Sequence, residues 1–90
     1  MRKWFVYIAR CSDGSLYTGI TVDIKRREKE HNLDNKKGAK SLRGKRPIRI
    51  VFYEKYQTES EARKRENAIK QRHRSYKLKL IQRFEIGGLP

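Results

Sequence analysis

The sequence predicts a small α+β domain with the element order ββαβα(α), in which a three-stranded mixed or antiparallel sheet is flanked by helices. Three observations support this fold class. The chain has 90 residues, enough for one compact domain. Asp13-Gly14 stands between two runs of strand-forming residues, which is a strong hairpin signal. Thr58 and Glu61 have the spacing of a helix capping box.

The first two strands are expected over residues 4–11 and 15–20, where aromatic and β-branched residues dominate. The turn between them is Ser12-Asp13-Gly14. The length of this turn decides which side chains share a face of the sheet, because neighbouring residues of a strand point to opposite faces.

A two-residue turn would put Tyr7 and Tyr17 on opposite faces. A three-residue turn with Gly14 in the left-handed conformation would instead pair Ala9 with Tyr17 and Tyr7 with Gly19. We predict the second arrangement. Both phenols then lie on one face, and Gly19 leaves open space beside Tyr7 that a phosphate group can enter.

A short helix is expected over residues 24–32, capped by Thr21 or Asp23, whose side-chain oxygens can accept from the free N–H groups of the first turn. Residues 33–46 contain many charges and few apolar residues, so they are expected to form a loop.

A third strand is expected over residues 48–53. The helix that the capping box opens should run to about Arg72, and a further helical piece should cover residues 76–84. The chain is therefore expected to form one domain over residues 1–84, followed by a C-terminal tail over residues 85–90, in which Gly87-Gly88 and Pro90 favour mobility.

The chain is strongly basic: 24 Lys and Arg against 10 Asp and Glu give a net charge of +14. This imbalance favours phosphate-rich polymers or anionic surfaces as partners. Cys11 is the single cysteine, which excludes an internal disulfide and fits a reducing compartment. With His31 and His73 it provides too few ligands for a structural zinc site. No apolar run approaches membrane-spanning length, and a cytoplasmic location is expected.

Arg27 and His31 lie four residues apart on the helix expected over residues 24–32, on the same side as Ile24. If Ile24 packs inward, both polar side chains are drawn towards the body of the protein. Two interpretations stay open. Arg27 and His31 form part of a site, or Arg27 pairs with a nearby acid and His31 interacts favourably with the helix dipole.

Glu66 is a second polar residue on an expected inward stripe, between Ala62 and Ile69 and followed by His73. A carboxylate drawn towards a core must be paired or bound to a metal. One alternative is an ion pair, for instance with Arg27. The other is a ligand for Mg²⁺, an ion that proteins often hold through one or two carboxylates together with water and substrate phosphate.

A free phenol titrates near ~10 and is a weak base at neutral pH. Arg27, Lys40 and a metal ion nearby would favour the phenolate form of Tyr7 or Tyr17 and make a general base available. The alternative is that these tyrosines only pack the sheet.

The frames Phe5-Val6-Tyr7 and Tyr17-Thr18-Gly19, with the later Arg, His and Glu, resemble the GIY-YIG nuclease superfamily, in particular its small bacterial members. The resemblance covers nearly the whole chain. The first frame departs from the pattern, because Phe5 stands where the superfamily name has glycine. Asn67 directly follows Glu66, so it does not match the later asparagine that larger members use.

The resemblance implies catalytic roles for the two motif tyrosines, a phosphate-contacting arginine and a helical histidine, which here are Tyr7, Tyr17, Arg27 and His31. It implies Glu66 as the metal-binding glutamate. Gly38-Ala39-Lys40 and Arg43-Gly44 resemble the basic loop of the small members. Lys40, Arg43 and Gly19 are the expected nucleic-acid contacts.

The function expected from this resemblance is a DNA endonuclease that depends on Mg²⁺ or Mn²⁺, with a protein partner as a possible source of targeting. Two other classes stay open. One is a nucleic-acid-binding module whose nuclease site is vestigial or very slow, and the other is a basic structural RNA-binding protein. Charge supports the enzyme and the binding module equally; only the alignment of Tyr7, Tyr17, Arg27 and Glu66 around one cleft favours the enzyme. The structural RNA-binding protein predicts no such cleft.

Overall fold

The computed structural model describes residues 3–87 and contains the expected three-stranded sheet. Its strands are β1 (Trp4–Arg10), β2 (Leu16–Thr21) and β3 (Arg49–Tyr56). The strand order is β2-β1-β3, and both pairs are antiparallel. The α+β fold class is thus confirmed, with an antiparallel sheet.

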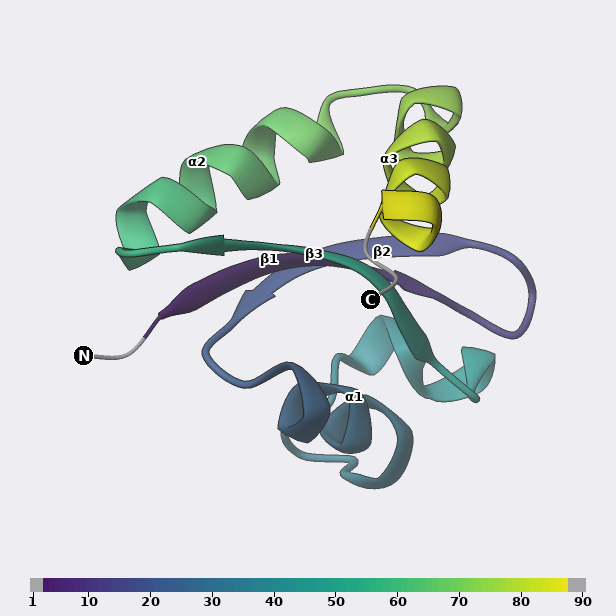
Figure 1. Cartoon of the computed structure of the whole chain (residues 1–90). Coiled ribbons are helices and arrows are strands. Elements are labelled where there is room, and N and C mark those ends of the chain that lie inside the picture. The colour runs from purple at the N-terminus through teal and green to yellow at the C-terminus, as the bar shows by residue number, and fades with distance from the viewer. Residues whose placement is uncertain (1–2, 88–90) are drawn as a thin grey trace.

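Helices cover both faces of the sheet (Figure 1). One layer holds α1 (Ile24–Leu33) and a 3₁₀ helix, η1 (Lys40–Lys45). The other layer holds α2 (Glu59–Lys70) and α3 (Arg74–Gly87). None of the helices in the described part of the chain is long and apolar enough to cross a membrane.

Several sequence-based boundaries change. β3 runs to Tyr56, beyond the expected end at residue 53, and α3 begins at Arg74, two residues before the expected start. η1 lies inside the segment expected to be a loop, and Leu42, buried at 2 % exposure, anchors it. α2 ends at Lys70 instead of about Arg72. α3 continues through Gly87, so the tail prediction is wrong for residues 85–87, and residues 88–90 lie outside the described residues.

The hairpin has the predicted three-residue turn. Gly14 has a φ of +86°, and the backbone N–H of Cys11 donates to Ser15 at 2.9 Å. The Asp13 carboxylate accepts from the backbone and the hydroxyl of Ser15, which stabilises the turn. The register therefore pairs Tyr7 with Gly19, as predicted.

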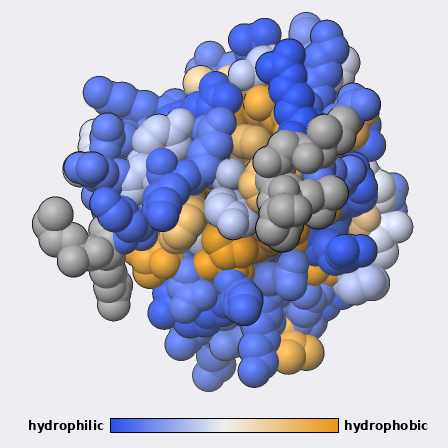
Figure 2. All heavy atoms as spheres, viewed as in Figure 1, coloured by the Kyte–Doolittle hydropathy of each residue, from blue (hydrophilic) through white to orange (hydrophobic). Residues whose placement is uncertain are grey.

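The central strand β1 is buried on both faces, because it lies between the two helix layers. Val6 and Ile8 pack against residues of α2 and α3, whereas Tyr7 and Ala9 pack against η1 and the start of β3. Figure 2 shows hydrophilic residues over most of the visible face, with hydrophobic residues concentrated between the two layers. Tyr7 is therefore part of the core as well as a candidate site residue.

Polar contacts hold α1 against the sheet. Asp23 caps its first turn by accepting from the N–H of Arg26. The Asn32 side chain bonds to both the N–H and the carbonyl of Ile48, and Glu28 accepts from the N–H of Ile50. These bonds place a helix that is poor in apolar residues in contact with Tyr7 and its neighbours.

Candidate active site

Three aromatic side chains predicted as site residues meet on one face of the sheet. The Tyr7 hydroxyl oxygen lies 2.7 Å from His31 Nε2. The Tyr17 ring centroid is 6.3 Å from that of Tyr7 and 5.4 Å from that of His31. Tyr7 and His31 are fully buried, and Tyr17 is partly exposed. The two tyrosines therefore share a face, and Tyr17 is the one that solvent reaches.

Gly19 allows Tyr7 to lie where it does. A Cβ atom at position 19 would stand 2.6 Å from the Tyr7 hydroxyl oxygen and 2.8 Å from its Cζ. The expectation of open space for a phosphate at Gly19 is therefore wrong, because the Tyr7 ring itself fills the space. Gly19 is buried and acts on the position of Tyr7.

Burial raises the pKa of Tyr7 to about 12. The Arg27 guanidinium lowers this pKa by hydrogen bonding and by its charge, while Tyr17 and the negative charge of Glu66 raise it. Tyr7 thus keeps its proton at neutral pH. Arg27 of α1 thus lies beside the Tyr7 hydroxyl, whereas Glu66 lies in the opposite helix layer and acts on Tyr7 only through its charge.

Burial also lowers the pKa of His31 to about 4, and the positive charges of Arg27 and Arg46 act in the same direction. Its imidazole is neutral at neutral pH, so a favourable interaction of an imidazolium with the helix dipole does not explain His31. The ring is held at both nitrogens: Nε2 faces Tyr7, and Nδ1 accepts from the backbone N–H of Ala39 at 3.3 Å.

We expect acidification to destabilise the protein between pH 6.5 and about 4. The unfolded chain protonates His31 below its ordinary pKa of 6.5, whereas the folded protein keeps the ring neutral to about 4. The unfolded state binds more protons in this window, so the free energy of unfolding falls by up to ~3 kcal/mol as the pH drops. Urea unfolding at several pH values in this range measures the slope of the free energy of unfolding against pH. His31→Gln should reduce it and the exposed His73→Gln should not; equal slopes in the two variants would contradict the assignment.

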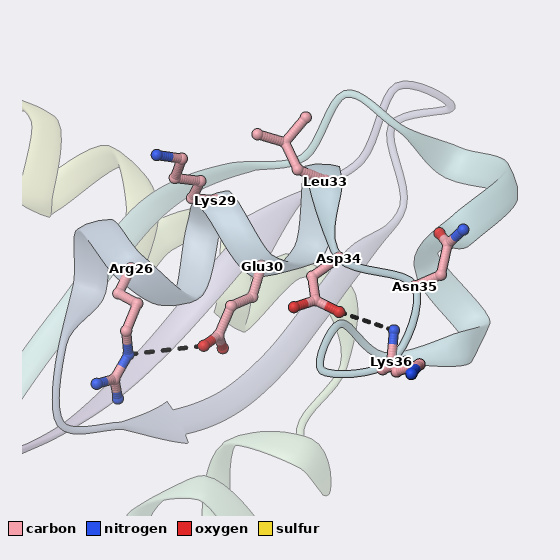
Figure 3. Close-up of a pocket in the computed structure, with 7 residues that line it drawn as sticks. All are labelled: Arg26, Lys29, Glu30, Leu33, Asp34, Asn35 and Lys36. Carbon is pink, nitrogen blue, oxygen red and sulfur yellow. Dashed lines mark hydrogen bonds and ion pairs between the residues drawn. The ribbon is translucent and has the colours of Figure 1, made fainter.

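Arg27 is fixed by α1 itself and by the loop that follows. Its Nη1 donates to Glu30 Oε1 at 3.0 Å and to the Lys37 carbonyl at 2.7 Å. Glu30 also pairs with Arg26 at 3.6 Å, as the dashed line in Figure 3 marks. The interpretation that Arg27 pairs with a nearby acid is confirmed. The same side chain also reaches Tyr7 and is 23 % exposed, so pairing does not remove it from the candidate site.

A hollow on α1 and the loop after it is a separate feature (Figure 3). Its lining combines basic and acidic side chains with the exposed Leu33, and comprises Arg26, Lys29, Glu30, Leu33, Asp34, Asn35 and Lys36. None of these residues belongs to the aromatic cluster, and the hollow shares only Glu30 with the surroundings of Arg27.

Glu66 lies on α2 with 8 % of its surface exposed, between the buried Ala62 and Ile69 as predicted. Its ion-pair partner in the described part of the chain is Lys70, at 3.3 Å, so the suggested pair with Arg27 is wrong. The inward stripe does not extend to His73, which is exposed because α2 ends at Lys70.

The donor set at Glu66 fits a hard divalent cation held by one carboxylate. Within residues 3–87, no three His, Cys, Asp or Glu side chains cluster as they would around an ion bound by protein alone. A cation here would take one protein ligand and complete its shell with water and substrate oxygens, as Mg²⁺ commonly does.

Lys40 and Arg43 are exposed on η1, and within the described residues neither side chain forms a hydrogen bond with the aromatic cluster. Arg43 donates to the Asn35 carbonyl. Sequence reasoning missed Glu30 and the Gly38–Ala39 backbone as supports of the site. The three-residue spacing of Arg27 and Glu30 is a signal that could have identified Glu30; nothing in the sequence pattern marks the contact of Ala39 with His31.

The sequence pattern of the GIY-YIG catalytic domain matches residues 3–79. The UPF0213 protein SERP0126 of Staphylococcus epidermidis is 52 % identical over 82 residues, which span 91 % of this chain and 98 % of that protein. The UPF0213 protein DP2720 of Desulfotalea psychrophila is 50 % identical over 84 residues, spanning 93 % of this chain and 76 % of that protein. The solution NMR structure of the UPF0213 protein BH0048 from Bacillus halodurans aligns with a TM-score of 0.56 at 40 % identity, covering 89 % of this chain and 83 % of that one. The chain therefore belongs to the GIY-YIG nuclease family.

Proposed function

We propose that this protein is a divalent-metal-dependent endonuclease that hydrolyses phosphodiester bonds in DNA. The observation that carries the proposal is the meeting of Tyr7, Tyr17 and His31 on one face of the sheet, beside Arg27 of the same helix layer. The net charge of +14 supports a nucleic-acid substrate. A basic structural RNA-binding protein predicts no such cluster of side chains.

Tyr17 is the better candidate for the general base, because it is partly exposed while Tyr7 is buried and keeps its proton. In this mechanism Tyr17 acts as the base that takes a proton from water as the water oxygen bonds to phosphorus. The bond to the leaving oxygen breaks, and that oxygen takes up a proton from solvent. Arg27 contacts the phosphate and counters the charge that develops on it. Glu66 would hold Mg²⁺ or Mn²⁺, which when bound supplies positive charge for the developing negative charge on the phosphoryl and leaving oxygens.

The proposal is tested by incubating the full chain with plasmid DNA and with DNA and RNA oligonucleotides, in Mg²⁺, in Mn²⁺ and in EDTA. Glu66→Ala and Tyr17→Phe are assayed in parallel. Metal-dependent cleavage of DNA that both variants lose supports the proposal. Binding without cleavage in any metal would favour a nucleic-acid-binding module, and cleavage retained in EDTA would contradict the role of Glu66.

We expect phosphate contacts on η1 to dominate the binding of nucleic acid. Replacing both Lys40 and Arg43 by glutamine should weaken binding to all sequences alike. It should reduce the slope of log K against log salt concentration by about two, roughly one for each lost phosphate contact. The exposed pair Lys79 and Arg83 on α3 provides a charge-matched control. If its replacement reduces the slope as much, net charge and not η1 determines binding.

A further inference from the structure

The segment after α1 approaches the helix more closely than a side chain would allow. Gly38 donates its N–H to the Asp34 carbonyl at 2.9 Å. A Cβ atom at this position would stand 2.5 Å from the Glu30 carbonyl oxygen and 2.8 Å from that of Asp34. Both are backbone atoms and cannot move aside cheaply. Glycine at position 38 is thus a condition for the path that the chain takes to Ala39.

This path directs the backbone N–H of Ala39 at Nδ1 of His31, at 3.3 Å. A neutral imidazole has one donor nitrogen and one acceptor nitrogen. Because a backbone N–H can only donate, the nitrogen that it faces must be the acceptor, and the hydrogen of His31 must be on Nε2. The opposite tautomer would set two N–H groups against each other in a buried site and leave both unsatisfied.

We propose that the Gly38–Ala39 backbone is a positioning element that fixes His31 as the Nε2–H tautomer, so that His31 donates a hydrogen bond to the Tyr7 oxygen and cannot take the Tyr7 proton. The Tyr7 hydrogen then points away from His31. With the Tyr7 proton kept from His31 and Tyr7 itself fully buried, Tyr17 is left as the base. The catalytic part of this inference rests on the proposed function, but the tautomer of His31 does not.

The surroundings of the pair support this assignment. The Tyr7 oxygen and His31 Nε2 are 2.7 Å apart, and both side chains are fully buried, so water does not compete for the hydrogen bond. His31 is neutral at neutral pH, which means that the ring carries one hydrogen and the position of that hydrogen matters. Ala39 has no other hydrogen-bond acceptor for its N–H within the described residues.

The tautomer can be observed directly in the full chain by two-bond ¹H–¹⁵N correlation spectra of the imidazole rings at neutral pH. The exposed His73 serves as the reference in the same spectrum. We expect His31 to show a protonated Nε2 and an unprotonated Nδ1. A protonated Nδ1, or averaged signals like those of a free ring, would overturn the proposal whether or not the protein cleaves DNA.

Ala39→Pro removes the donor with little change to the backbone, because Ala39 has a φ of −64°, which proline prefers. Ala39→Ser keeps the N–H and is the control. In Ala39→Pro we expect His31 to lose its single tautomer and kcat to fall about tenfold at unchanged KM, the effect of losing one hydrogen bond worth ~1.4 kcal/mol. A single Nε2–H tautomer that persists in a folded Ala39→Pro variant would contradict the role of Ala39.

A second pair of variants tests the direction of the hydrogen bond even if Ala39→Pro does not fold. Gln at position 31 can donate from the place of Nε2 but cannot take up a proton, whereas Leu can do neither. We expect His31→Gln to retain at least ten times the kcat of His31→Leu. Equal loss of activity in the two would mean that His31 accepts the Tyr7 proton, and would overturn the proposal. A wild-type protein that cleaves nothing refutes the proposed function, while the ¹⁵N spectrum still decides the tautomer.

Discussion

Replacement of Glu66 by glutamine is expected to abolish cleavage while the protein stays folded and still binds nucleic acid. Glutamine keeps the size of the side chain but removes the charge that a divalent cation requires. The ion pair that is lost joins Glu66 to Lys70 on the same helix, and the lysine side chain is 51 % exposed. Such a pair contributes only about 0.5 kcal/mol, so loss of the pair alone does not unfold the protein.

The experiment compares cleavage rate, nucleic-acid affinity and melting temperature. Glu85→Gln is the control, because it removes the same charge from an exposed position on α3. We expect cleavage to vanish in Glu66→Gln alone, with affinity unchanged or slightly higher because a negative charge near the phosphate is gone. Full activity in a folded Glu66→Gln variant would refute the metal site. A large fall in melting temperature would assign Glu66 a structural role.

Gly19→Ala is expected to lower both stability and activity, through Tyr7. The added methyl group would overlap the Tyr7 hydroxyl oxygen at 2.6 Å and Cζ at 2.8 Å, and the ring is fully buried. Overpacking of this kind costs about 1–3 kcal/mol, and relief requires the ring to move away from His31. Cleavage should fall with the loss of that contact. Urea unfolding and the cleavage rate measure the two effects.

Two further variants separate the steric clash with Tyr7 from a general effect of replacing glycine by alanine. Gly44→Ala is the control, because a Cβ atom at position 44 would meet nothing within 4 Å. Adding Tyr7→Phe to Gly19→Ala removes the closest atom but leaves Cζ in place, so it should restore part of the stability and none of the activity. If Gly19→Ala matches wild type in both measurements, Tyr7 is not held against β2 as described.

Local patterns predicted the features that depend on neighbouring residues. The turn at Gly14 determined the hairpin register, and the capping box at Thr58 correctly located the start of α2. The inward position of Glu66 followed from helical periodicity alone. Each of these depends on a spacing of only a few residues, which a single sequence displays.

Close approaches between distant segments were not predictable in this way. Gly19 was expected to leave a gap, yet the Tyr7 ring occupies that space. The Ala39 N–H reaches His31 only because Gly38 lets the chain pass against α1, a fact of packing that no local pattern expresses. His73 was placed on an inward stripe because the end of α2 at Lys70 has no sharp sequence signal.

The two helix layers are held against the sheet by different kinds of contact, and this difference affects the stability of the site. Within α1, which the structure describes completely, His31 is the only buried residue, so polar bonds such as those of Asn32 and Glu28 hold this helix in place. Each such bond has a net worth of about 1 kcal/mol, less than a buried aliphatic side chain of the opposite layer contributes. Arg27 and His31 can thus detach in a local opening that leaves the sheet intact. The assembled site is less stable than the fold that carries it, and heat would inactivate the protein before unfolding it.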